Sequence, residues 1–137
     1  MTVLVDTPVW SLALRRSRVQ AGAIQKELAS LVEEGRATII GPIRQELLSG
    51  VRERAQFERL REHLGTFPDL PLITVDYEEA VRDCNLCRAR GVQGSHTDFL
   101  LCAVASRHGI RIFTTDRDFE RYARVLPLAL HVPRDEG

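Results

Sequence analysis

Two kinds of hydrophobic pattern alternate along the chain. Short apolar runs rich in β-branched residues, such as TVLVD and RIFT, are typical of strands that are buried on both faces. Between these runs, apolar residues recur every three or four positions, which predicts amphipathic helices. We therefore expect strands, separated by helical segments, over residues 2–6, 37–40, 72–75, 111–114 and 128–132.

Capping residues mark the ends of the predicted helices. Thr7 and Pro8 fit the N-cap and the first helical position of a helix that follows the first strand. The pairs Asp76 with Glu79 and Ser95 with Asp98 have the spacing of a capping box, so each predicts a helix start. Glycines supply the C-terminal ends of the helices, at Gly35, Gly91 and Gly109.

The alternation of buried strands and helices favours an α/β fold, with a central parallel sheet flanked by helices on both faces. Ligands of such folds bind at the carboxyl ends of the strands. Asp6 ends the first strand, and Asp116 follows the strand at residues 111–114. We therefore expect both carboxylates at the same edge of the sheet.

Two further acids can reach this edge. Glu46 lies in the short helix after the second strand, just ahead of two leucines, and Asp98 lies in the first turn of the most hydrophobic helix. Taken alone, each acid is better explained as a residue of a turn, a helix cap or a solvated helix face. Together, carboxylates near apolar surface would repel one another, and Mg²⁺ or Mn²⁺ would remove that conflict. The pattern therefore raises the hypothesis of a metal site.

Composition limits the class of protein. The chain has 137 residues, of which 44% are hydrophobic and 28% charged, so we expect one soluble domain over residues 1–137. No apolar run approaches the roughly 18 residues of a membrane span, and the start lacks a signal-peptide pattern, so we expect a cytoplasmic protein.

The net charge does not indicate a nucleic-acid binder, because the charges of the 19 basic and 19 acidic residues cancel. Almost all positive charge is arginine, which either grips phosphate or reflects a GC-rich genome.

Other chemistry-bearing residues are better explained by packing. Cys84 and Cys87 form a single CxxC in a helical segment, without the second ligand pair that a structural zinc site requires. The four histidines are scattered, and only His96 lies near the acids. Trp10 closely follows Asp6, and we interpret it as a core or dimer-contact residue rather than as a platform for stacking bases.

Four blocks of the chain resemble the motifs of PIN-domain nucleases, in particular the VapC-type toxins of toxin–antitoxin pairs. The blocks are VLVDTPVW, PIRQELLSG, HTDFLLCAVASRHG and IFTTDRDFERY, and they match in order, in spacing and across nearly the whole chain. Thr115 and Ser11 match polar positions that often support the metal site of this family. The family's acidic metal-binding residues correspond here to Asp6, Glu46, Asp98 and Asp116, with Asp118 as a more variable fifth acid.

The resemblance implies a PIN-like three-layer α/β/α fold and an endoribonuclease that depends on Mg²⁺ or Mn²⁺. One cation held by Asp6, Asp98 and Asp116 would activate water, and a second near Glu46 or Asp118 would steady the leaving oxygen. Products would carry a 5′-phosphate and a 3′-hydroxyl. Candidates to grip the phosphates of the RNA are Arg15, Arg16, Arg18, Arg52, Arg54, Arg88 and Arg90.

The resemblance also implies two partners, a second copy of the chain in a homodimer and a small antitoxin that covers the acidic site. The apolar residues Trp10, Leu12 and Leu14 are candidates for one of these contacts.

Two other functions compete with the interpretation as a ribonuclease toxin. A PIN-like module could bind RNA or protein without cutting, although an intact acid set argues against it. A phospho-acceptor fold would need a second acid beside Asp6, and VDTPVW has none.

Overall fold

The computed structural model describes residues 1–14 and 22–134. Within these residues, one parallel sheet has three strands in the order β2-β1-β3. The strands are β1 (Val3–Val5), β2 (Ala37–Thr38) and β3 (Arg111–Phe113). In the register of the sheet, Val3 lies between Ala37 and Arg111, and Val5 pairs with Phe113. The first strand of the chain is thus the central strand, and it is buried on both faces.

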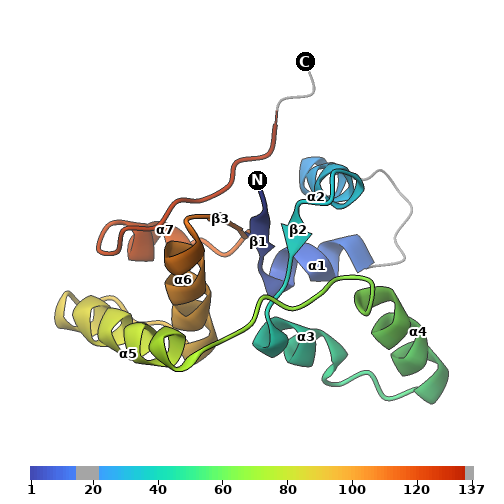
Figure 1. The fold of residues 1–137 in the computed structure, drawn as a ribbon, viewed down its shortest axis with the longest axis horizontal. Helices are drawn as coiled ribbons and strands as arrows, with labels where there is room; N and C mark the ends of the chain where they lie inside the picture. Colours follow the sequence, from blue (N-terminus) through green and yellow to red (C-terminus); the bar gives the residue numbers. More distant parts are fainter. Residues whose placement is uncertain (15–21, 135–137) are drawn as a thin grey trace.

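Helices flank this sheet in two groups (Figure 1). One group, on the β2 side, comprises α1 (Thr7–Leu14), α2 (Ala23–Glu33), α3 (Gly41–Leu48) and α4 (Arg54–Leu64). The other group, on the β3 side, comprises α5 (Thr74–Ala89), α6 (His96–His108) and α7 (Asp118–Ala123). The α/β fold with a central parallel sheet is therefore confirmed.

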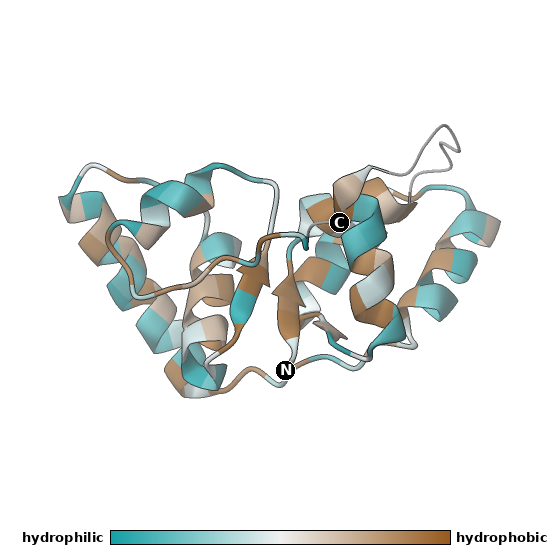
Figure 2. Ribbon diagram, turned by 90° about the horizontal axis from the view of Figure 1, so that it is seen from above, coloured by the Kyte–Doolittle hydropathy of each residue, from teal (hydrophilic) through white to brown (hydrophobic). Residues whose placement is uncertain are grey.

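The core lies along the strands and the helix that packs closest to them. Figure 2 shows hydrophobic residues concentrated on the central strands and hydrophilic residues on the outer turns of the flanking helices. Helix α6 buries residues all round, including Phe99, Leu101 and Val104. Its predicted ends are confirmed, because the Ser95 side chain caps the first turn and Gly109 follows the last turn with a φ of 65°. None of the helices in the described residues is long and apolar enough to cross a membrane.

The expected strand at residues 72–75 is wrong. Helix α5 already begins at Thr74, because the Asp76 carboxylate accepts a hydrogen bond from the Ile73 amide at 3.0 Å and so caps the first turn. Glu79, the expected second member of the capping box, instead pairs with Arg82 one turn further on. The β-branched residues that suggested a strand remain largely exposed on the start of the helix.

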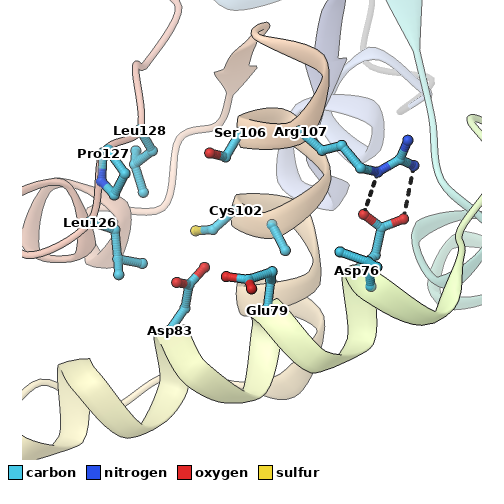
Figure 3. Close-up of a pocket in the computed structure, with 11 residues that line it drawn as sticks. Asp76, Glu79, Asp83, Cys102, Ser106, Arg107, Leu126, Pro127 and Leu128 are labelled. Atoms are coloured by element: carbon cyan, nitrogen blue, oxygen red, sulfur yellow. Dashed lines mark hydrogen bonds and ion pairs between the residues drawn. The ribbon is translucent and has the colours of Figure 1, made fainter.

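An ion pair between a buried carboxylate and an exposed arginine joins α5 to α6 (Figure 3). Asp76 is only 1% exposed, and its two carboxylate oxygens accept hydrogen bonds from Nε and Nη2 of Arg107 at 2.7 and 2.9 Å. This contact holds the pKa of Asp76 below its usual value, chiefly through the hydrogen bonds from Arg107. The same carboxylate therefore caps one helix and binds the other.

The expected strand at residues 128–132 is reduced to a single parallel bridge between Leu130 and Ile112. The Ile112 amide donates to the Ala129 carbonyl, and the His131 amide donates to the Ile112 carbonyl. Prolines at positions 127 and 133 flank this short pairing, and proline cannot donate to a strand ladder.

Side chains hold the rest of this segment against α2. The carboxylate of Glu27, 5% exposed, lies 2.6 Å from His131 Nε2 and accepts hydrogen bonds from Arg134 Nε and the Arg134 amide. Arg134 also pairs with Glu34, at the C-terminal end of α2. Glu27, Glu34, His131 and Arg134 together hold the segment that follows residue 130 against α2.

Candidate active site

Asp6 lies at the carboxyl end of the central strand and is 5% exposed. Its Oδ1 accepts a hydrogen bond from the Thr7 amide at 2.8 Å, and its Oδ2 accepts one from Thr114 Oγ1 at 2.7 Å. Its carbonyl accepts the amides of Val9 and Trp10. Asp6, rather than Thr7, therefore caps α1, and the expectation of a Thr7 cap is wrong by one residue.

Because Thr7 does not cap α1, its hydroxyl can contact a second acid. Thr7 Oγ1 donates to Glu46 Oε2 at 2.6 Å, across 39 residues of sequence. Glu46 is exposed on α3, where sequence analysis placed it close to the buried side. The contact brings Glu46 next to the residue that follows Asp6 and leaves its other carboxylate oxygen for a further partner.

Asp98 enters the site from the N-terminal turn of α6. Its amide donates to the Oγ of Ser95 at 3.1 Å, which fixes the start of the helix. Its Oδ2 accepts a hydrogen bond from the Tyr122 hydroxyl at 2.6 Å. The carboxylate is half-buried and is anchored on one oxygen by a residue of α7.

Asp116 and Asp118 lie at the start of the helix that follows β3. The Asp116 amide donates to Thr114 Oγ1 at 3.0 Å, and Asp116 Oδ1 accepts from the Asp118 amide at 2.9 Å. Asp118 begins α7 and lies 3.7 Å from Arg121 in an ion pair. Asp116 thus binds the first amide of the helix, in line with the capping alternative, whereas the Asp118 carboxylate pairs with Arg121. That role leaves Asp116 Oδ2 available for a further ligand.

Electrostatics shows that the carboxylates influence one another. The pKa of Asp6 is raised from 3.8 to about 6, chiefly by burial and in part by the charges of Asp98 and Asp116, while the hydrogen bonds from Thr114 and Thr7 act in the opposite direction. Burial also raises the pKa of Asp98, with repulsion from Asp116 and Asp118 in the same direction. The fold therefore keeps acids together at a cost that a cation would relieve.

The donor set fits a hard divalent cation, since carboxylate oxygens are the ligands that Mg²⁺ and Mn²⁺ prefer. Within residues 1–14 and 22–134, no group of three or more Asp, Glu, His or Cys side chains is arranged so that it could hold a metal ion as it stands. The hydrogen bonds explain this, because Asp6, Asp98 and Asp116 each direct an oxygen to a protein donor. Binding a cation would therefore require the acid side chains to rearrange.

Sequence reasoning missed two residues of this site, Thr114 and Tyr122. It assigned a supporting role to Thr115, which is exposed, whereas the neighbouring Thr114 bonds both Asp6 and the Asp116 amide. The register could have shown this, because a pairing of Val5 with Phe113 places the next residues, Asp6 and Thr114, side by side. Ser11 lies half-buried on α1, and Arg15, Arg16 and Arg18 lie outside the described residues.

The remaining candidates are placed as follows. Trp10 is 2% exposed and its indole nitrogen donates to the Val5 carbonyl at 3.1 Å, so its interpretation as a core residue is confirmed. The free thiols of Cys84, Cys87 and Cys102 are buried. His96 is exposed at the start of α6. Exposed arginines that remain available for phosphate are Arg52, Arg54, Arg88 and Arg90.

The chain belongs to the PIN domain family, whose model matches residues 3–125. Within the family, it is similar to Ribonuclease VapC11 of Mycobacterium tuberculosis, at 30% identity over 128 residues that cover 92% of this chain and 95% of the relative. The resemblance to PIN domains that the four sequence blocks suggested is confirmed.

Solved structures show the same fold at low sequence identity. FitAcB from Neisseria gonorrhoeae superposes with a TM-score of 0.76 at 20% identity, covering 96% of this chain and 98% of the other. A toxin–antitoxin complex from Klebsiella pneumoniae superposes with a TM-score of 0.63 at 21% identity, covering 86% and 90%.

Proposed function

We propose that this protein is a Mg²⁺- or Mn²⁺-dependent endoribonuclease and the cytoplasmic toxin of a toxin–antitoxin pair. The observation that carries the proposal is the buried carboxylate of Asp6, held at the end of the central strand with Asp98 and Asp116 close enough to raise its pKa. The similarity to a protein named as a VapC ribonuclease supports the same activity.

Asp6, Asp98 and Asp116 are the residues proposed to hold the cation, with Asp118 beside them. When bound, the cation would lower the pKa of water and offset the negative charge of the scissile phosphate. Thr114 keeps Asp6 and Asp116 in place, because its hydroxyl bonds the side chain of one and the amide of the other.

Glu46 has a different position from the other acids. Its Oε2 is held by Thr7, and the residue is exposed, so its free oxygen can accept a hydrogen bond from water or from RNA. We propose that Glu46 orients the attacking water at the rim of the site. Arg15 and Arg16, just beyond the end of α1, are proposed to contact the phosphates that flank the cut.

Cleavage of a pool of structured RNAs by the antitoxin-free protein tests the activity. We expect products with a 5′-phosphate and a 3′-hydroxyl in Mg²⁺ or Mn²⁺, and none in EDTA. RNA is expected to be cut in loops and single strands, where the backbone is accessible. Binding of RNA or Mn²⁺ without any cut, under conditions in which a known ribonuclease is active, would favour the alternative of a non-catalytic PIN-like module.

An apolar groove is available for the antitoxin. A cavity of about 470 Å³ lies between α1, α2 and α4, with Leu14, Leu28 and Phe67 in its wall, and a second hollow of about 350 Å³ adjoins it at Leu14 and His63. The C-terminal half of α1 forms one wall of the groove, and the helix follows directly after Asp6, so an occupant that continues along α1 toward its first turn reaches the acids. We propose that a C-terminal segment of the antitoxin docks here.

A homodimer needs a contact surface other than the groove proposed for the antitoxin. Ile73, just before α5, and Tyr77 and Val81 on α5 expose apolar side chains at a four-residue spacing, which places them on one face of the helix. We propose that this strip is covered by a second copy of the chain, because an uncovered apolar strip of this kind is uncommon on a monomer.

A pair of charge substitutions separates the two surfaces. Leu14→Glu places a carboxylate in the groove and is expected to weaken binding of the small protein encoded beside this chain by at least about tenfold, with the dimer mass unchanged. Val81→Glu is expected to halve the mass measured by light scattering and to leave that affinity largely intact. If neither variant changed mass or affinity, both surface assignments would be wrong.

A further inference from the structure

The hydroxyl of Tyr122 contacts the candidate metal site, although sequence analysis assigned no role to this last residue of the block IFTTDRDFERY. Tyr122 Oη donates to Asp98 Oδ2 at 2.6 Å. The residue is fully buried, and its ring packs against Phe99 and Phe119 at centroid distances of 5.0 and 5.1 Å. A tyrosine hydroxyl is protonated at neutral pH and can donate to a carboxylate, which only accepts. A ring confined in this way has little freedom to direct its hydroxyl elsewhere.

The space for this hydroxyl depends on Gly94. A Cβ atom at position 94 would lie 2.1 Å from Tyr122 Oη and 2.6 Å from its Cζ. Gly94 does not have a positive φ, so its backbone conformation alone does not require glycine. The glycine is therefore needed because the tyrosine hydroxyl passes so close to it.

The hydrogen bond links two helices that carry acids of the site. Asp98 is anchored by its amide to Ser95 and by its carboxylate Oδ2 to Tyr122, and the Ser95 side chain also interacts with the carboxylate. Tyr122 lies one turn after Asp118 on α7, so the same bond fixes α7 against the first turn of α6.

We propose that Tyr122 is a positioning residue, which holds the Asp98 carboxylate in the orientation that binds the catalytic cation. The inference rests on the proposed function, since it assigns a role within that metal site. Partners that orient a metal ligand typically change metal affinity or activity by about 10- to 100-fold when they are removed.

Mn²⁺ binding measured by calorimetry on the full chain tests the proposal. Tyr122→Phe keeps the ring and removes the hydroxyl, and it is expected to raise the Kd for Mn²⁺ about tenfold or more. In the cleavage assay, kcat should fall while KM for RNA changes little, because Tyr122 is buried away from solvent. Tyr77→Phe, which removes the hydroxyl of an exposed tyrosine on α5, is the matched control and should change neither quantity.

Two further variants separate positioning from a structural role. Gly94→Ala leaves both Tyr122 and Asp98 intact but displaces the hydroxyl, so it should reproduce the loss of Mn²⁺ affinity. Phe119→Leu loosens the same aromatic cluster but keeps the hydroxyl, and it should lower the melting temperature with Mn²⁺ affinity retained.

Three outcomes would overturn the inference. Wild-type affinity in Tyr122→Phe or in Gly94→Ala would show that the hydroxyl does not position Asp98. Equal losses of affinity in Tyr122→Phe and Phe119→Leu would show that the cluster acts only through stability. A wild-type protein that neither binds Mn²⁺ nor cuts RNA would overturn the proposed function, and this inference with it.

Discussion

Replacing Asp6 by asparagine is expected to abolish cleavage and, at the same time, to stabilise the metal-free protein at pH 8. The loss of activity should exceed about 100-fold, because Asp6 is a proposed metal ligand and not merely a partner of one. The gain in stability follows from burial, which raises the pKa of the Asp6 carboxyl to about 6. The two effects have the same origin, because the buried Asp6 carboxylate carries its negative charge in a place where only a bound cation would stabilise that charge.

The sign of the pH dependence follows from this raised pKa. A carboxyl whose pKa is higher in the folded state than the unfolded value of 3.8 binds protons more tightly when folded. The metal-free wild type should therefore lose stability as the pH rises through 6, and should gain it as the pH falls toward 4. With partial relaxation of the site, we expect Asp6→Asn to raise the free energy of unfolding at pH 8 by about 1–2 kcal/mol.

Asp83→Asn is the matched control for this experiment. Burial, together with the charge of Glu79, also raises the pKa of Asp83 to about 6, but Asp83 lies on α5 in a separate hollow beside Cys102 and Leu126 (Figure 3). Its replacement should also stabilise the protein at pH 8 and leave cleavage unchanged. Mn²⁺ should raise the melting temperature of the wild type and of Asp83→Asn, but not that of Asp6→Asn. Full activity in Asp6→Asn would contradict the assigned site.

Arg107→Met is expected to destabilise the protein strongly. It leaves the Asp76 carboxylate, 1% exposed, without its cation, and a buried charge that has lost its partner destabilises the folded state. Because Arg107 keeps the pKa of Asp76 low, this stabilisation is present at neutral pH and is lost only in acid. Urea unfolding at pH 7 measures the change.

A double variant shows whether the unpaired charge is responsible. Asp76→Asn in the Arg107→Met background removes the charge but keeps an oxygen that can accept the Ile73 amide and so cap α5. We expect it to recover at least half of the lost free energy. A double variant as unstable as Arg107→Met would assign the loss to the packing of the arginine stem instead.

The sequence predicted those elements whose local signals agree with their burial. Helix α6 is an example, because its hydrophobic run, its Ser95 cap and its Gly109 end all specify the same helix. The segment at residues 72–75 misled, because β-branched residues were taken to indicate a buried strand while Ile73 and Val75 are in fact exposed. The helix begins there because the Asp76 carboxylate accepts the Ile73 amide, and its contact with Arg107, 31 residues away, which no local pattern reveals, holds the helix against α6.

The candidate site shows the same limit. Asp6 and Asp116 could be placed at one edge from the strand pattern alone, since parallel strands end together. The contacts of Thr114 with Asp6, of Thr7 with Glu46 and of Tyr122 with Asp98 depend on the register of the sheet and on how α7 packs against α6. Hydrogen bonds of this kind are settled by tertiary structure, and a sequence pattern only identifies residues that are capable of them.

The order of the strands has a consequence for the newly made chain. The central strand β1 is synthesised first, but its neighbour β3 is synthesised more than a hundred residues later, and the hydrogen bond from Thr114 to Asp6 spans 108 residues. Pairings of such long range form late, because the chain must close a large loop before they contribute. On the ribosome, Asp6 therefore emerges long before Asp116, and the acidic centre stays unassembled while most of the polypeptide is being translated. An RNA-cutting protein built in this order would be inert toward the messenger and the ribosome that are producing it.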